Sequence, residues 1–154
     1  LILASAAIGG KSVIIRSLRF SNTFNKMVLM VQQARSNAIT GKGGAMAYGI
    51  NIDTVGNKFA IFSGTSTTIA ETLQAPTGLS FSAKTTATSP TSCNPSANIE
   101  FKSPKPDNPN LETTLTCYRD NTVKQLEIGL CGDAACTNAK SFLINKAAGI
   151  PQVQ

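Results

Sequence analysis

Four cysteines are the residues of this 154-residue chain best suited to chemistry: Cys93, Cys117, Cys131 and Cys136. No two of them form the Cys-x-x-Cys spacing that is typical of zinc sites and thioredoxin-like redox motifs. Histidine is absent, which excludes a histidine-containing triad and a histidine-bearing zinc or haem site, and leaves no imidazole to activate a thiol. An even number of cysteines favours two structural disulfides in an oxidising compartment. A zinc site made of cysteines alone and four free buried thiols are the alternatives.

Carboxylates are the other candidates for catalysis, but the sequence does not indicate that any two of them act as a catalytic pair. Asp53, Glu71, Glu100 and Glu127 each occupy a polar position of an expected strand or turn. A solvated surface is a more common explanation for such residues than a paired-carboxylate hydrolase. The glycine-rich stretch 41–44 lacks the Gly-Lys-Ser/Thr ending of a phosphate-binding loop. We therefore expect no enzyme, no cofactor and no bound metal ion.

One long amphipathic helix is predicted over residues 11–40, which contain neither Gly nor Pro. Its apolar residues recur at steps of three and four, the helical period, and include Ile14, Leu18, Phe24, Val28, Val31, Ala34 and Ala38. Gly41 is the residue at which this helix is predicted to end. The helix would be about 45 Å long, longer than a body of this size needs, so we expect its N-terminal part to project.

The segment before this helix is almost entirely apolar from Leu1 to Ile8. Eight residues span about 12 Å as a helix, too little to cross a bilayer alone. The chain begins with Leu, so we expect a processed or truncated start with further apolar residues upstream. Gly9 and Gly10 follow, and each should weaken a helix locally by about 1 kcal/mol relative to Ala.

After Gly44 the apolar period changes from 3.6 to 2, which predicts antiparallel strands. The turn residues 53–57 separate two alternating runs and predict a hairpin. Further short strands are expected around Ile69, Leu73, Leu79, Phe81, Ile99, Phe101, Phe142 and Ile144, before residues 149–151 end the ordered structure. The expected class is α+β, with the helix (1–42) packed on one antiparallel sheet (43–154).

A second hairpin is predicted from Leu111 to Leu130, with its turn at residues 120–121. This register places Leu115 opposite Leu126 and all apolar residues on one face. Cys117 then lies on the apolar face and Cys131 on the other, which disfavours a bond between these two. We therefore favour Cys93–Cys117, which closes a long loop worth about 3 kcal/mol, and Cys131–Cys136, which closes a short one.

Charge is concentrated at the start of the chain. The six basic residues of segment 1–42 stand without any acidic residue, whereas segment 43–154 has eight of each sign. A basic segment behind apolar residues is typical of contact with anionic lipid headgroups, and it is also found in nucleic-acid binding. A solvated helix face is the simpler interpretation.

The arrangement resembles the type IV pilins and type II secretion pseudopilins. Residues 24–28 (FNKMV) leading to 33–39 (QARSNAI) resemble the end of the first helix in pseudopilin H and FimT-like minor pilins. Residues 79–81, 99–101 and 126–128 resemble strands that follow in that group, and the similarity runs loosely from Leu1 to Ile150. The leader-cleavage motif of that family has no counterpart among these residues.

The resemblance implies a structural subunit, major or minor, of an extracellular filament. Before assembly the subunit would sit in the bacterial inner membrane, and the pilus assembly machinery would then bring copies of it or other pilins together. Filament-packing residues would be Ile2, Leu3, Ile8, Ile14, Ile15 and Leu18. Helix-on-sheet packing would use Phe24, Val28, Val31, Ala34 and Ala38. Gly9 and Gly10 could mark a point where the helix unwinds in the filament.

Two other functions stay open at this stage. A pilin-like DNA-binding module for DNA uptake would need a basic patch on the body, for which the candidates are Lys102, Lys105, Lys140 and Lys146. A secreted β-rich adhesin or enzyme unrelated to pilins is the third hypothesis, with a host surface as its partner. The loops at 84–97 and 102–110 are long enough to carry binding functions.

Overall fold

The computed structural model describes residues 2–41, 46–64 and 68–154, with the backbone alone for residues 2–11. Its first element is α1 (Ile2–Thr40), a helix of 39 residues, or about 58 Å at 1.5 Å per residue. Gly9 and Gly10 lie inside α1, so they do not interrupt the helix here. Gly41 follows with a φ of 59°, the left-handed conformation that glycine adopts at little cost at a helix C-terminus.

The strands form two antiparallel sheets. The five-stranded sheet has the order β3-β2-β1-β5-β6 and contains β1 (Ala47–Asp53), β2 (Lys58–Ser63), β3 (Ile69–Gln74), β5 (Ser96–Lys102) and β6 (Glu112–Cys117). The four-stranded sheet has the order β4-β7-β8-β9 and contains β4 (Ser80–Thr85), β7 (Gln125–Cys131), β8 (Ala139–Asn145) and β9 (Pro151–Val153). The α+β class is therefore confirmed, whereas the expectation of a single sheet is wrong.

The first predicted hairpin is confirmed. β1 and β2 pair with Ile50 opposite Ile61 and Ile52 opposite Phe59. The turn begins at Asp53, whose carboxylate accepts hydrogen bonds from the backbone amides of Val55 and Gly56. This side-chain bond to the following backbone is the reason that aspartate favours such turns.

The second predicted hairpin is wrong, because β6 and β7 belong to different sheets. The chain turns immediately after Cys117, with Tyr118 at a φ of 56° and the amide of Asp120 bonded to the Cys117 carbonyl. β6 then pairs with β5, with Leu115 opposite Ile99, and β7 pairs with β4 and β8. Alternation fixes which residues face inward, but it does not select the partner strand.

The chain also stays ordered beyond the point expected. β9 pairs with β8, with Val153 opposite Phe142 and Pro151 opposite Ile144. Gly149, at a φ of 60°, turns the chain back and donates its amide to the Asn145 carbonyl. Proline is tolerated in β9 because an edge strand leaves one side of its backbone unpaired.

The core lies between α1 and both sheets. Its helical part is a stripe of side chains at alternating steps of four and three residues, with Met30 beside it: Phe20, Phe24, Met27, Val31, Ala34 and Ala38. Phe24 meets Phe142 of β8 edge-on, with ring centroids 6.0 Å apart. Phe59 of β2 approaches Phe81 of β4 at 5.8 Å. These aromatic pairs join the helix and the two sheets into one apolar interior.

Candidate functional site

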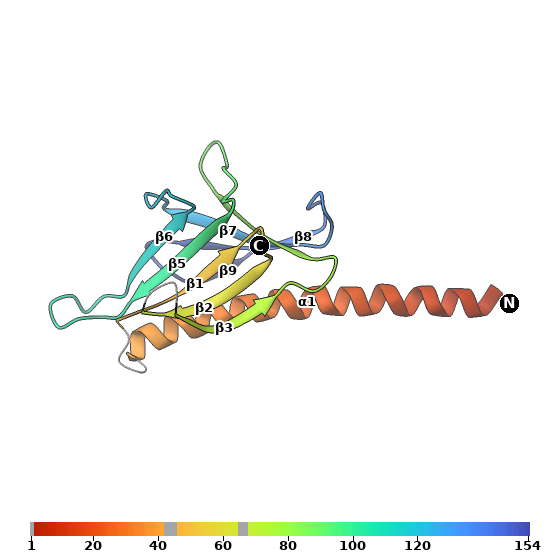
Figure 1. The fold of residues 1–154 in the computed structure, drawn as a ribbon, viewed down its shortest axis with the longest axis horizontal. Coiled ribbons are helices and arrows are strands. Elements are labelled where there is room, and N and C mark those ends of the chain that lie inside the picture. The colour runs from red at the N-terminus through yellow and green to blue at the C-terminus, as the bar shows by residue number, and fades with distance from the viewer. Residues whose placement is uncertain (1, 42–45, 65–67) are drawn as a thin grey trace.

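The N-terminal half of α1 extends as a rod beyond the sheets, which gather around its C-terminal half (Figure 1). Every residue from 12 to 19 is exposed. Among them Val13 is 68% exposed, Ile14 61% and Leu18 57%, and Ile15 is exposed as well. Large apolar side chains grouped on one exposed segment are typical of a surface that another molecule covers.

The direction in which α1 leaves the body is fixed by polar contacts. The Arg16 guanidinium donates a hydrogen bond of 2.8 Å to the carbonyl of Gly132. The Lys140 ammonium donates one of 3.2 Å to the Ser21 hydroxyl and lies 5.8 Å from the centroid of the Phe20 ring. The loops 75–79 and 132–138 flank the helix at this point, and both contribute to the grooves beside it. The helix is therefore held where it emerges.

The helix residues singled out in the sequence fall into three groups. Ile14, Ile15 and Leu18 are exposed on the projecting part. Phe24, Val31, Ala34 and Ala38 are buried against the sheets, and Val28 is partly buried there. The side chains of Ile2, Leu3, Ile8 lie outside the described residues, and the backbone at Gly9 and Gly10 is helical.

Both favoured disulfides are present. Cys93–Cys117 spans Cα atoms 4.8 Å apart, and Cys131–Cys136 spans 4.7 Å. Cys93 also donates its amide to the carbonyl of Ala83 in β4, whereas Cys117 ends β6. The first disulfide thus links the four-stranded sheet to the edge of the five-stranded sheet. The cysteine pairing was predicted correctly, although the predicted hairpin from Leu111 to Leu130 on which the prediction rested is wrong.

The four lysines proposed for DNA binding do not form one patch. Lys102 pairs with Glu112 at 3.4 Å, and Lys140 is engaged with α1 through Ser21. Lys140 and Lys146 lie near opposite ends of β8, while Lys102 ends β5 in the other sheet. This placement gives the DNA-binding interpretation no concentrated basic surface among these residues.

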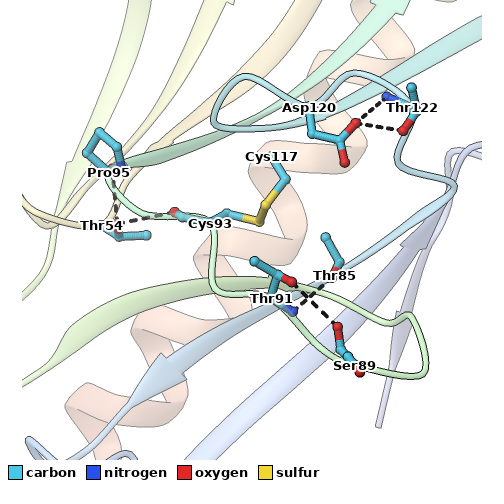
Figure 2. Close-up of a disulfide and its surroundings, with 9 residues drawn as sticks. All are labelled: Thr54, Thr85, Ser89, Thr91, Cys93, Pro95, Cys117, Asp120 and Thr122. Carbon is cyan, nitrogen blue, oxygen red and sulfur yellow. Dashed lines mark hydrogen bonds between the residues drawn. A yellow bond between two sulfur atoms is a disulfide. The ribbon is translucent and has the colours of Figure 1, made fainter.

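A cleft of about 570 Å³ lies between residues 85–94 and residues 117–125. Figure 2 shows the Cys93–Cys117 disulfide between these two segments, with Asp120 and Thr122 on one side and Thr85, Ser89 and Thr91 on the other. A volume of this size lies within the roughly 300–1,000 Å³ of small-molecule sites. No described side chain of α1 contributes to it.

The lining of this cleft is mostly hydroxyl and amide side chains. One carboxylate oxygen of Asp120 accepts hydrogen bonds from the Thr122 hydroxyl at 2.6 Å and the Thr122 amide at 2.8 Å. These two bonds hold the pKa of Asp120 below its ordinary value of 3.8, so the carboxylate is ionised at neutral pH. Gln125 accepts a bond from the Thr86 hydroxyl through Oε1.

Sequence reasoning did not find this cleft. It assigned residues 84–97 to a loop and Asp120 to a hairpin turn. The available signals were the run of Ser and Thr between positions 85 and 92 and the Asp-x-Thr spacing at 120–122. Neither signal shows that the two segments meet, because the contact depends on β4 and β6 lying in different sheets.

Within the described residues, no helix is long and apolar enough to cross a membrane. The same part of the chain contains no group of three or more cysteine, aspartate or glutamate residues that could hold a metal ion. A scan against protein-family models, a search of curated proteins and a search of solved structures found no match to the chain. The function is therefore inferred from its own residues and structure.

Proposed function

We propose that the protein is a structural subunit of an extracellular filament of the type IV pilus kind, assembled through its N-terminal helix. The observation that carries this proposal is the exposed apolar segment of α1 around Val13, Ile14 and Leu18. Full burial of one such side chain is worth about 1.5–3 kcal/mol. Packing this segment among like helices would therefore stabilise an assembly substantially.

The division of the chain into a projecting helix and a sheeted body suits this role. A helix bundle buries apolar stripes in its interior while polar surfaces face outward. In this chain the body has its own core, and none of the described side chains of the projecting segment, residues 12–19, belongs to that core. The segment is thus available for contacts between subunits without disturbing the fold of the body.

The proposal includes where the subunit resides. Before assembly, the apolar start and the following basic residues would sit in and at the inner membrane, with the pilus assembly machinery as partner. After assembly, the sheets would face the exterior, an oxidising environment in which the two disulfides persist. Copies of the chain or other pilins would cover the helix.

The test is an aspartate substitution in the projecting helix of the full-length protein, in cells that make it. Val13→Asp places a charge on the surface that neighbouring helices would bury. Val55→Asp is a matched control, because Val55 is 67% exposed, close to the 68% of Val13, but lies in the β1–β2 turn. The measurement is the amount of each variant in sheared filaments, by immunoblot and immunogold microscopy.

We expect Val13→Asp to reduce incorporation at least about tenfold, the effect of 1.4 kcal/mol per subunit, and Val55→Asp to incorporate normally. Both variants should keep the circular dichroism spectrum of the wild type. Incorporation of Val13→Asp at the wild-type level would contradict the proposal. So would the absence of the wild-type chain from any filament fraction.

A further inference from the structure

The cleft beside the Cys93–Cys117 disulfide has the features of a ligand site that the filament proposal does not use. We propose that it binds an uncharged oligosaccharide. The cleft lies away from α1, because its lining comes entirely from residues 85–94 and 117–125. In Figure 1 the green loop that follows β4 rises on the opposite side of the sheets from α1. Binding here therefore does not require filament assembly.

Hydrogen-bonding groups without intramolecular partners line this cleft. The second carboxylate oxygen of Asp120 has no hydrogen-bond partner among the described residues, and it points away from Thr122, toward the segment with Thr85 and Thr91 (Figure 2). Gln125 uses its Oε1 for Thr86 and keeps its amide NH₂ group, two donors, for a ligand. A mixture of fixed acceptors and donors matches sugar hydroxyl groups, since each hydroxyl both donates and accepts.

An aromatic ring stands at the same cleft. Tyr118 lines it and is 47% exposed. Its backbone is fixed, because its amide donates to the Ser96 carbonyl at 2.8 Å and its neighbour Cys117 is tied to Cys93. The Arg119 guanidinium lies 5.0 Å from the ring centroid. The face of the ring opposite Arg119 would offer an apolar surface to the C–H groups of a pyranose ring, whose hydroxyl groups project from its edge.

The charge of the cleft favours a neutral ligand. Asp120 and Lys124 are the charged residues of its lining and carry opposite signs, while the Arg119 guanidinium is held over the Tyr118 ring beside them. An ionised Asp120 would repel a phosphate or a sialic acid, whereas it accepts strong hydrogen bonds from neutral hydroxyl groups. Hydroxyl and amide side chains make up most of the remaining lining. A polyanion such as DNA would need several unpaired cations at the site.

The test uses the purified full chain on an array of neutral, sialylated and sulfated glycans, followed by calorimetric titration of each glycan that binds. A zwitterionic detergent covers the apolar helix, because a maltoside or glucoside would itself supply a sugar. Asp120→Asn keeps one oxygen to accept the Thr122 bonds but loses the free acceptor. Asp133→Asn is the matched control, since Asp133 also accepts bonds from a threonine but lies outside the cleft.

We expect a neutral glycan to bind, Asp120→Asn to raise its Kd at least about tenfold, and Asp133→Asn to change it less than about twofold. Tyr118→Gly, which suits the positive φ at this position, should weaken binding by a similar factor. Three outcomes would overturn the proposal: no neutral glycan binds at millimolar concentration, binding survives the Asp120 and Tyr118 changes, or only sialylated or sulfated glycans bind.

Discussion

Asp133 holds the loop that closes the β7–β8 connection. Its carboxylate accepts hydrogen bonds from the Thr137 amide at 2.9 Å, the Thr137 hydroxyl at 2.7 Å and the Asn138 amide at 2.8 Å. The Thr137 hydroxyl and then the backbone amides lower the pKa of Asp133 from 3.8 to about 2. A lowered folded-state pKa means that the stabilisation is complete above the unfolded value and is lost as the pH falls toward 2.

The prediction at the residue scale is an NMR titration of the Asp133 carboxylate with a midpoint near 2. Thr137→Val removes the hydroxyl donor but leaves the backbone amides, so the midpoint should rise toward 3.8. The Cys131–Cys136 bond keeps the loop closed in both proteins. A midpoint of 3.8 in the unmodified chain would show that these hydrogen bonds do not persist in solution.

The strand β1 is constrained on both sides, because it lies at the centre of the five-stranded sheet between β2 and β5. At Gly49 a Cβ atom would collide with the Ile99 carbonyl oxygen and the Phe62 ring. The carbonyl belongs to the backbone of β5, so it moves only if the sheet moves. This close approach explains why glycine occupies the centre of a strand, where it otherwise costs stability.

The prediction at the element scale is that Gly49→Ala lowers the free energy of unfolding by about 1–3 kcal/mol, the usual cost of overpacking. Gly129→Ala in β7 is the control, because its nearest obstacle is the Ser82 hydroxyl at 2.6 Å, a side-chain end that can rotate away. Denaturant unfolding of both variants gives the comparison. Equal stability of the two would contradict the role assigned to the Ile99 carbonyl.

For the whole molecule, the two disulfides differ in what they join. Cys93–Cys117 connects the two sheets and joins positions 24 residues apart in the sequence. Cys131–Cys136 joins positions 5 residues apart, at the start of the connection between β7 and β8 of the four-stranded sheet. In the chain-entropy model these bonds contribute about 3 and 2 kcal/mol, respectively. We expect Cys93→Ala/Cys117→Ala to destabilise the chain by more than Cys131→Ala/Cys136→Ala.

Unfolding in guanidinium chloride, with each double variant measured against the wild type, checks this order. The Cys93/Cys117 variant should also lose the fixed spacing between the two segments that line the cleft, because the disulfide ties residue 93 of one segment to residue 117 of the other. An opposite order of stability would mean that the link between the sheets is redundant with the contact of Phe59 and Phe81.

The sequence alone determined the features that depend on local pattern. The period of three and four predicted residues 11–40 of α1 and the end of the helix at Gly41. Alternation predicted most strands, though not β9, and the β1–β2 hairpin, where a connection of four residues leaves no other partner in reach. It also marked the apolar residues that α1 leaves exposed. These are properties of neighbours along the chain.

The tertiary structure decided which strands meet. The apolar faces of β6 and β7 match each other as well as they match β5 and β8, so alternation could not choose between one hairpin and two sheets. The choice follows from the common core with α1, which buries Leu115 and Leu126 through different sheets. The cleft exists only because β6 and β7 lie in different sheets, since its two walls are residues 85–94 and residues 117–125, which are distant in the sequence.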